Sequence, residues 1–259
     1  MKKNKLSKQN NLLNKLFTAP KIEDAKCVLC VQPHSDDNEI GMGATIKKFV
    51  DNGCEVHYLT VTDGRLGTTN PKKDLNELKK IRRKEATKAG KSLGVKNFHF
   101  MDYKDGTLKN PRKLSYEICE LIREIKCDYV FVCDPYNSYE AHLDHIIVGQ
   151  AVSQAVLSAS LAYYPEKTKT KPFEVKCIGY YFTSNPNTFI NIDNEIEAQF
   201  AAMSMHSSQI NEKMLMLYKG YLSNQYVGYS KDMECNFAQG FKLLSPLHLH
   251  CITEANLIS

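Results

Sequence analysis

The sequence predicts a single α/β domain with a mostly parallel sheet flanked by helices. Between residues 26 and 161, short apolar runs of strand length alternate with amphipathic segments of helical period, and no tight hairpin turn joins successive runs. The chain of 259 residues, of which 42% are hydrophobic, is also long enough to bury one sizeable core. We expect the domain to span residues 26–259, after an N-terminal extension at residues 1–25.

The expected elements follow from hydrophobic periodicity and from capping and turn residues. Strands are predicted at residues 26–32, 54–62, 98–101, 129–133, 175–182 and 188–192. Helices are predicted at residues 41–53, 75–93, 114–125, 146–161 and over most of 195–217. The pattern is weaker in the C-terminal third, where the Tyr-rich stretch 218–229 and the segment 237–241 receive no assignment. We expect this third to decorate the domain.

The composition excludes several classes of protein. The formal net charge of +5 is small and charges of both signs are interspersed, so the chain has no basic stripe for nucleic acid. No apolar run approaches the ~20 residues that a membrane-spanning helix needs. The nine cysteines are scattered through apolar runs, which is typical of a reducing compartment, and we expect a cytoplasmic protein.

Two local patterns near the N-terminus have a structural interpretation. Apolar residues at helical spacing in 12–17 predict a short amphipathic helix that docks on the domain rather than on a membrane surface. Cys27-x-x-Cys30 has the spacing of a redox or zinc motif. Residues three apart on a strand face opposite sides, however, and no second cysteine pair completes a site, so we expect these side chains to pack in the fold.

Imidazole and carboxylate side chains follow two of the predicted strands directly. The members are His34, Asp36 and Asp37 after strand 26–32, and His142, Asp144 and His145 after strand 129–133. Clustered like charges repel one another unless they are solvated or paired, so such clusters usually bind an ion or another ligand. Because the carboxyl ends of parallel strands share one edge of a sheet, the two clusters can meet.

The side chains in the two clusters suit a divalent metal. His34 and Asp37 are three residues apart at a helix start, which puts both on one side, while Asp36 points elsewhere. His142 and His145 share this spacing. Two histidines and one carboxylate leave metal positions open for water and substrate, as in catalytic zinc and non-haem iron sites. A further carboxylate can then take a proton from water, and a further histidine steadied by Asp144 can donate to an oxyanion.

In order and spacing, the motifs resemble those of the PIG-L/LmbE-like N-acetylglucosaminyl deacetylases. That family has His-Pro-Asp-Asp-Glu before a glycine-rich helix start and His-Pro-Asp-His about a hundred residues later. The similarity also takes in Thr62-Asp63-Gly64 and Arg82-x-x-Glu85. The nearest subgroup is the bacterial enzymes that make glucosaminyl-malate for bacillithiol, because Glu39-Ile40-Gly41 follows the two aspartates as it does there.

The resemblance implies a Rossmann-like domain that hydrolyses the acetamide of a glucosamine unit. It assigns the metal ligands to His34, Asp37 and His145, with Zn²⁺ as the usual metal and Fe²⁺ as an alternative. It makes Asp36 the general base and His142 an acid or oxyanion stabiliser that Asp144 orients. Arg82 falls at a substrate-contacting position. The expected partner is a small amino-sugar substrate, and a homo-oligomer is expected because the family often assembles.

The sequence departs from the family pattern in ways that bear on the substrate. Family residues are replaced at Ser35, Asn38, Leu143 and Gln239, and the first and third change loop stiffness rather than ligand chemistry. All five arginines precede the second metal motif, whereas the bacillithiol-type enzymes use a further arginine after it. Only lysines such as Lys167 could substitute, so a malate conjugate is doubtful as the substrate.

Other interpretations of the same residues stay open. A metal-containing binding or regulatory protein that has lost turnover would keep the cluster, and a non-haem iron oxygenase would use the same ligand set. Arg82 could pair with Glu85 or Asp74 on an exposed helix face. Gly41-x-Gly43 does not predict a dinucleotide loop, because a third glycine is missing and carboxylates precede the turn.

Overall fold

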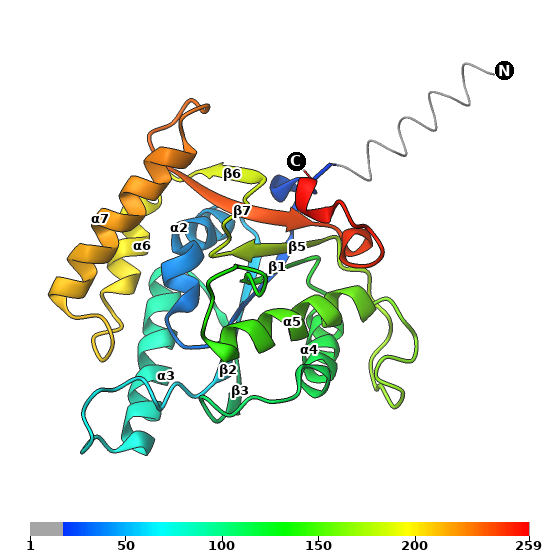
Figure 1. Ribbon diagram of the computed structural model, residues 1–259, viewed down its shortest axis with the longest axis horizontal. Coiled ribbons are helices and arrows are strands. Elements are labelled where there is room, and N and C mark those ends of the chain that lie inside the picture. The colour runs from blue at the N-terminus through cyan, green and yellow to red at the C-terminus, as the bar shows by residue number, and fades with distance from the viewer. Residues whose placement is uncertain (1–17, 259) are drawn as a thin grey trace.

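A seven-stranded sheet lies at the centre of the computed structural model, which describes residues 18–258 (Figure 1). Its strand order is β3-β2-β1-β4-β5-β7-β6. The strands are β1 (Cys27–Gln32), β2 (Glu55–Thr62), β3 (Asn97–Tyr103), β4 (Tyr129–Cys133), β5 (Cys177–Tyr181), β6 (Thr188–Asn191) and β7 (Ala238–Leu244). The first five strands pair in parallel, whereas β7 runs antiparallel to both β5 and β6. The predicted α/β class with a mostly parallel sheet is confirmed.

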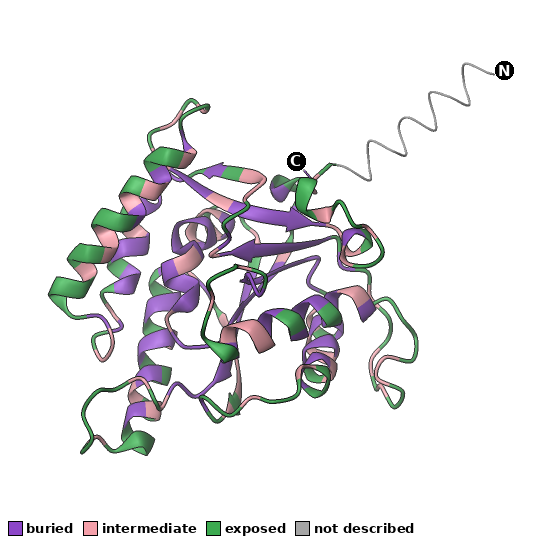
Figure 2. Cartoon of the chain, in the orientation of Figure 1, coloured by how far each residue is buried: buried purple, intermediate pink, exposed green. Residues whose placement is uncertain are grey.

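Helices cover both faces of the sheet. They are α2 (Asp37–Asp51), α3 (Leu75–Ser92) and α6 (Ile196–Met203) on one face, and α4 (Pro111–Ile125) and α5 (Leu143–Ser158) on the other. The last helix, α7 (Glu212–Tyr229), packs outside α6 and against β7. Figure 2 shows the strands and the inner helix faces buried, while α7 has a broad exposed side. The arrangement matches the three-layer architecture of parallel sheets that are covered on both faces.

The strands that carry the two clusters are neighbours in the sheet. The chain runs outward from β1 through β2 to β3 and then returns to the other side of β1 as β4. The direction of winding therefore reverses between β1 and β4. In open α/β sheets this reversal leaves a crevice at the carboxyl ends of the strands, where ligands bind. Both clusters open into that crevice.

The C-terminal third differs from the sequence prediction. The helix predicted over 195–217 consists of α6 and α7, which residues 204–211 separate. Asn211 caps α7, because its side-chain oxygen accepts a hydrogen bond of 2.9 Å from the backbone N–H of Met214. The helix continues through the Tyr-rich stretch. The part of α7 after residue 217 escaped prediction because Leu222 and Tyr226 are the only buried residues of the helix, which leaves no apolar stripe.

Helix α2 also begins earlier than predicted, at Asp37 instead of Gly41. Its first turn consists of polar residues that are nevertheless buried, so hydrophobic periodicity does not reveal it. Acidic side chains at Asp37 and Glu39 suit this position, because the amino end of a helix carries a partial positive charge. The early start places Asp37 directly at the carboxyl edge of β1.

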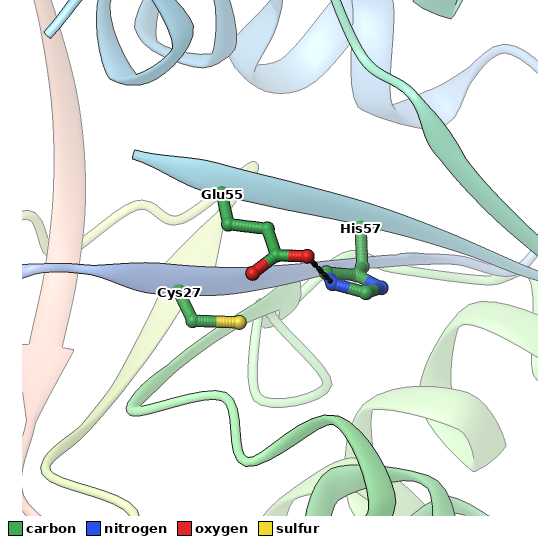
Figure 3. A group of neighbouring side chains, drawn as sticks. All are labelled: Cys27, Glu55 and His57. Carbon is green, nitrogen blue, oxygen red and sulfur yellow. Dashed lines mark hydrogen bonds and ion pairs between the residues drawn. The ribbon is translucent and has the colours of Figure 1, made fainter. Parts of the chain in front are cut away.

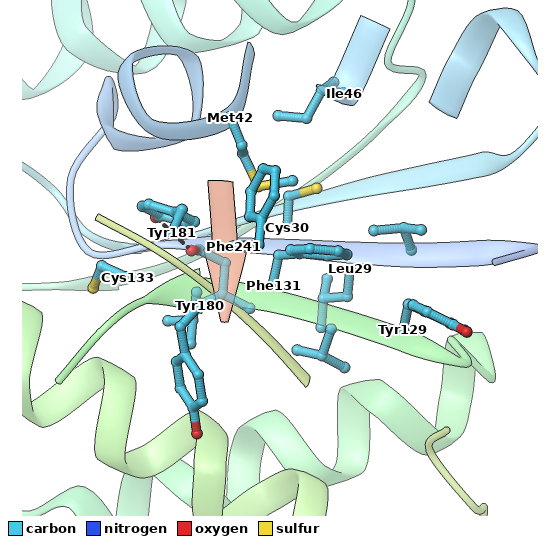
Figure 4. Packing of buried hydrophobic residues seen from close by; sticks show 14 of the residues in the cluster. Leu29, Cys30, Met42, Ile46, Tyr129, Phe131, Cys133, Tyr180, Tyr181 and Phe241 are labelled. Atoms are coloured by element: carbon cyan, nitrogen blue, oxygen red, sulfur yellow. Dashed lines mark hydrogen bonds between the residues drawn. The ribbon is translucent and has the colours of Figure 1, made fainter. Parts of the chain in front are cut away.

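Aromatic rings fill the core between the sheet and α2 (Figure 4). Phe131 on β4 contacts Phe49 and Phe241, with ring centroids 5.6 Å away in each case. A Cβ atom at Gly179 would lie 2.3 Å from Phe131, so only glycine fits beside the ring. Replacing a buried phenylalanine with alanine typically costs about 3–5 kcal/mol of stability. The core therefore fixes β4, and with it the start of the second cluster.

The described part of the N-terminal extension packs on the domain. Residues Ile22–Asp24 form a short 3₁₀ helix, and Ile22 is buried. The hydroxyl of Tyr129 donates a hydrogen bond of 2.5 Å to the carbonyl of Lys21. The amphipathic helix predicted at residues 12–17 lies outside the described residues. Across residues 18–258, no helix combines the length and the apolar character that a membrane crossing requires.

Candidate active site

Hydrogen bonds to the sheet hold the loop between β1 and α2. Gln32 Oε1 accepts a hydrogen bond of 3.1 Å from the backbone N–H of Asn38. The carbonyl of Pro33 accepts two hydrogen bonds from Thr62 on β2, one from the N–H at 3.0 Å and one from the hydroxyl at 2.8 Å. These contacts attach the first cluster to two strands rather than leaving it on a free loop.

Asp37 lies between two imidazole rings. Its Oδ2 accepts a hydrogen bond of 2.8 Å from the backbone N–H of His34 and lies 3.4 Å from the Nδ1 atom of that ring. Its Oδ1 lies 3.4 Å from His145 Nε2. One potential ligand atom from each of the three residues lies within 4.8 Å of the others, a span that one cation can bridge.

The second cluster approaches from the start of α5. His142 is the residue before the helix, and its Nδ1 accepts a hydrogen bond of 3.3 Å from the backbone N–H of Asp144. The His142 ring centroid is 4.5 Å from that of His34 and 5.2 Å from that of His145. Three imidazoles from two loops therefore converge, as expected from the shared sheet edge.

Asp144 contacts different groups from those that the sequence suggests. Its carboxylate is buried, accepts a hydrogen bond of 2.8 Å from the N–H of Gly106 and lies 3.7 Å from His34 Nε2. Its contact with His142 is made by the backbone N–H rather than by the carboxylate. Asp144 thus joins the loop after β3 to the His34 ring, and its backbone N–H contacts His142 in the turn at the start of α5. Potential ligand atoms of His34, His142 and Asp144 also lie within 4.8 Å of one another.

Arg82 reaches the site from α3. The side chain is 5% exposed, Nη2 donates a hydrogen bond of 2.9 Å to Asp36 Oδ1, and Nη1 donates one of 2.8 Å to the carbonyl of Gly64. The alternative pairing on an exposed helix face is wrong. Glu85 instead accepts hydrogen bonds from Ser207 and Ser208, in the segment between α6 and α7.

Two glycines let the Arg82 side chain pass. A Cβ atom at Gly64 would lie 2.8 Å from Arg82 Nη1, and one at Gly67 would lie 2.6 Å from the same atom. Gly64 also has a φ of +63°, a conformation that other residues seldom adopt. The loop after β2 is therefore shaped to admit the guanidinium group.

Two carboxylates that the sequence did not single out face the outer nitrogens of the proposed ligand rings. Asp105 Oδ1 lies 3.3 Å from His34 Nε2, and Glu140 Oε2 lies 3.3 Å from His145 Nδ1. Asp105 follows β3 at the same sheet edge, so the edge argument could have found it. The only sequence signal for Glu140 is its position two residues before His142.

This arrangement fits a divalent metal. The nitrogens His34 Nδ1 and His145 Nε2 face Asp37, while the opposite nitrogen of each ring faces a carboxylate. Metal-ligating histidines commonly have this second partner, because it fixes the ring and raises its basicity. Two imidazoles and one carboxylate also form a donor set that zinc and ferrous iron both accept.

The charges within the cluster shift several pKa values. Burial alone would lower the pKa of His34, but the surrounding carboxylates raise it well above its usual value. Burial would raise the pKa of Asp37, but the adjacent His145 and His34 hold it well below its usual value. The pKa of His142 is lowered, first by burial and then by the neighbouring imidazoles, which favours its neutral form.

A second group of potential ligands, drawn in Figure 3, lies where β1 and β2 begin, away from the carboxyl ends of the strands. It consists of Cys27, Glu55 and His57, and His57 Nε2 lies 3.1 Å from Glu55 Oε1. The Glu55 side chain is 61% exposed. Burial raises the pKa of the Cys27 thiol to about 12, so it stays protonated at neutral pH. These features, with Cys30 in the core, agree with the structural interpretation of the two cysteines.

Two cavities adjoin the cluster at the carboxyl edge. The smaller has a volume of about 250 Å³ and includes His34, Asp36, Arg82, Asp105 and His142 in its lining. The larger has a volume of about 520 Å³ and shares Asp37 and His145 with the proposed metal site. Its far wall comes from α7. Concave sites of this size beside converging polar groups are the usual places where small molecules bind.

His206, which sequence reasoning left uncertain, pairs with Glu39 on α2. Its Nε2 lies 3.1 Å from Glu39 Oε2, and both side chains are essentially buried. The pair links α2 to the segment between α6 and α7.

Comparison with known proteins identifies the family. Residues 29–156 match the PIG-L model, described as GlcNAc-PI de-N-acetylase. The chain is 34% identical over 256 residues to a diacetylchitobiose deacetylase of Thermococcus kodakarensis, covering 98% of this chain and 94% of that protein. The chain belongs to the PIG-L family of deacetylases.

Further relatives lie within the same family. The chain is 29% identical over 212 residues to a probable N-acetyl-α-D-glucosaminyl L-malate deacetylase 2 of Bacillus anthracis, covering 77% of this chain and 88% of that protein. Among solved structures, N,N'-diacetylchitobiose deacetylase from Pyrococcus horikoshii, in complex with its inhibitor MPG, superimposes with a TM-score of 0.89. That match has 31% identity and covers 96% of this chain and 97% of that one. The diacetylchitobiose deacetylases therefore match over more of the chain than the malate enzyme does.

Proposed function

We propose that this member of the PIG-L family is a zinc-dependent N-deacetylase that removes acetate from an N-acetylglucosamine unit. The observation that carries the proposal is the position of Asp37 between His34 and His145. The next carboxylate along the chain, Asp36, forms an ion pair with Arg82. His34, Asp37 and His145 would hold the metal. When bound there, a divalent metal polarises the acetamide carbonyl and makes water more acidic. Fe²⁺ suits the same donors, so metal analysis of the purified protein decides between the two.

Asp36 acts as the general base. The residue lines the smaller cavity, and within residues 18–258 it belongs to none of the groups of potential metal ligands, whereas Asp37 does. Arg82 Nη2 holds one carboxylate oxygen at 2.9 Å, which fixes the side chain and leaves the other oxygen to take a proton from water. The same carboxyl group can then pass the proton to the departing amine. Positioning by the buried arginine keeps the base within reach of the reacting water.

His142 stabilises the developing negative charge on the acetamide oxygen. The lowered pKa favours a neutral ring, and Nδ1 accepts a hydrogen bond from the N–H of Asp144. The proton of the neutral ring therefore resides on Nε2, which can donate a hydrogen bond to the oxygen. The ring lines the smaller cavity beside Asp36 and Arg82, where the reacting group would lie.

The substrate class follows from the relatives and from the polar lining of the smaller cavity. The named relatives act on N-acetylglucosamine-containing compounds. Arg82 and Asp105 both line this cavity and offer a donor and an acceptor of the kind that sugar hydroxyls bind. The nine cysteines, none of which forms a disulfide, suit the cytoplasm as the place of action.

The test is release of amine from N-acetylglucosamine and its conjugates. We expect turnover that a chelator abolishes and that added Zn²⁺ restores. Asp36→Asn should lower kcat by about 10²- to 10⁴-fold, because it removes a positioned base, yet should retain the metal. Full activity of that variant would show that Asp36 is not the base. Absence of product from every acetylated sugar, with metal bound, would instead favour a binding protein.

A further inference from the structure

Helix α2 is interrupted near its start. Met42 has a φ of −151° and a ψ of 19°, outside the helical range, and two helical segments meet there at a kink. The first segment, residues 37–41, carries Asp37, and Asp36 directly precedes it. The direction of this segment therefore decides where both carboxylates lie, so the contacts at the kink bear on the proposed site.

Gln199 on α6 holds the first segment. Its Nε2 donates hydrogen bonds of 2.9 Å to the carbonyl of Glu39 and of 3.0 Å to the carbonyl of Ile40. The side chain is fully buried. A Cβ atom at Gly43 would lie 2.9 Å from Gln199 Cγ, so the glycine lets α6 approach the kink. One amide from the C-terminal third thereby fixes the end of the segment that carries Asp37.

Gln239 on β7 holds the second segment. In an uninterrupted helix the N–H of Thr45 donates to the carbonyl four residues earlier. At the kink it donates a hydrogen bond of 2.9 Å to Gln239 Oε1, and the Thr45 hydroxyl donates one of 2.6 Å to the same oxygen. Gln239 Nε2 donates in turn to Gln199 Oε1 at 3.1 Å. The two amides are therefore joined, and each holds one of the two segments.

Gln199 and Gln239, which we call the amide clamp, are buried and fully paired. The hydroxyl of Tyr226 accepts a hydrogen bond from each amide, and all three side chains are at most 2% exposed. A buried polar network whose members all have partners favours one arrangement, because breaking a contact leaves a polar group unpaired. The opposite end of the first segment is fixed by the hydrogen bond from the N–H of Asn38 to Gln32.

Building on the proposed function, we propose that Gln199 and Gln239 are positioning residues, which aim the first segment of α2 so that Asp37 reaches the metal and Asp36 reaches the attacking water. Within residues 18–258, neither glutamine belongs to a group of potential metal ligands, so the clamp acts through the backbone of the segment. A clamp with a purely structural role would affect stability alone. Because Gln239 also lines the larger cavity, a substrate contact would instead affect mainly KM.

The first experiment removes the donors of Gln199. Gln199→Met keeps a side chain of similar length but loses both hydrogen bonds to the first segment. We expect its affinity for Zn²⁺, measured by competition with a chromophoric chelator, to fall about 10-fold, the lower end of the cost of losing support for a metal ligand. With saturating Zn²⁺, kcat should fall by up to about 10²-fold, because the base is displaced, while KM stays near the wild-type value. Unchanged affinity and kcat in the folded variant contradict the proposal.

A matched control lies on the other face of the sheet. Arg123 on α4 is also buried, and its guanidinium donates hydrogen bonds to the carbonyls of Ala159 at 2.9 Å and Ser158 at 3.3 Å. Arg123→Met should therefore lower the thermal transition, yet leave Zn²⁺ affinity and kcat at the wild-type values. If Zn²⁺ affinity falls equally in Arg123→Met and Gln199→Met, general loss of stability explains the effect and the proposal is wrong.

Two variants of Gln239 separate hydrogen bonding from packing. Gln239→Glu keeps an oxygen that can accept from Thr45, and a buried carboxyl group takes up a proton readily, which restores a donor. Gln239→Met removes both functions. We expect Gln239→Met to lose about 10-fold in Zn²⁺ affinity and Gln239→Glu to lose clearly less. Equal losses overturn the proposal, and so does a raised KM in Gln239→Met with unchanged Zn²⁺ affinity, which would assign the residue to substrate binding.

Failure of the clamp and failure of the proposed function have different signatures, because Zn²⁺ affinity is measured without substrate. If the wild type releases no amine from any acetylated sugar but both methionine variants bind Zn²⁺ more weakly, the proposed function is wrong and the clamp stands. If the wild type is active and both variants keep its Zn²⁺ affinity and kcat, this inference alone is refuted.

Discussion

The two walls of the site differ in the kind of side chain that builds them. The charged wall consists of His34, Asp36, Arg82, Asp105 and His142, and it comes from α3 and from the loops after β1, β3 and β4. The aromatic wall consists of Tyr218, Tyr221, Tyr226 and Tyr229 on α7. The elements of the charged wall are attached directly to the central sheet, whereas only Leu222 and Tyr226 of α7 are buried. Under the proposed function, the buried wall carries the chemistry, and the more exposed wall borders the space left for the rest of the substrate.

The largest effect is expected at the metal ligands. His145→Ala removes one of the three donors, so the protein should lose its tightly bound metal and, with it, essentially all turnover. Cys27→Ser is the control, because its cluster lies where β1 and β2 begin, away from the carboxyl ends of the strands. Metal content measured after dialysis should be one equivalent for the wild type and for Cys27→Ser. If Cys27→Ser binds less than one equivalent of metal, the metal site lies at the Cys27 cluster and not at His145.

A smaller loss is expected at Arg82. Lysine keeps the charge but cannot reach Asp36 and Gly64 together with a fork of N–H groups, so Arg82→Lys should lower kcat/KM about 10- to 100-fold. The matched control on the same helix is Arg83→Lys, because Arg83 is exposed and pairs with Asp102. If kcat/KM falls equally in both variants, the buried position of Arg82 gives it no special role in catalysis.

A stability effect should appear where α7 is anchored. The buried hydroxyl of Tyr226 accepts hydrogen bonds from the amides of Gln199 at 3.0 Å and Gln239 at 2.9 Å. Tyr226→Phe leaves both donors without this partner and should lower the free energy of unfolding by about 1–3 kcal/mol. Thermal unfolding measures it, with the exposed Tyr139→Phe as control. An unchanged transition would mean that other contacts hold the aromatic wall.

The smallest effect concerns the buried Glu39–His206 pair, which links α2 to the segment between α6 and α7. Burial raises the pKa of Glu39. Burial alone would lower the pKa of His206, but the contact with Glu39 outweighs burial and raises it. The folded state therefore binds more protons than the unfolded state. The histidine's contribution is fully present below its unfolded pKa of about 6.5 and is lost as the pH rises through the raised value.

The unfolding free energy of the wild type should accordingly fall more steeply above about pH 6.5 than that of His206→Gln. Denaturant titrations of both proteins at a series of pH values, at equal metal concentration, measure the two slopes. Parallel slopes would mean that His206 does not make the unfolding free energy depend on pH in this range.

Most of the central sheet could be predicted because its strands and helices have strong local patterns. The strand at 129–133 matches β4 at both ends, and the other parallel strands differ by a few residues. The start of α2 and the part of α7 after residue 217 were missed for opposite reasons. The first turn of α2 is polar but buried, and α7 is long and helical but presents no apolar stripe.

The sequence by itself determined the family, through two motifs that have the family's order and spacing. It also predicted that the two motifs meet, because the carboxyl ends of parallel strands share one sheet edge. Only the tertiary structure decided with which residue each charged side chain of the site pairs. Arg82 and Asp36 are 46 residues apart, and the tyrosines of α7 lie even farther from the motifs that they face. Such contacts depend on how distant segments pack, and neither periodicity nor local spacing carries that information.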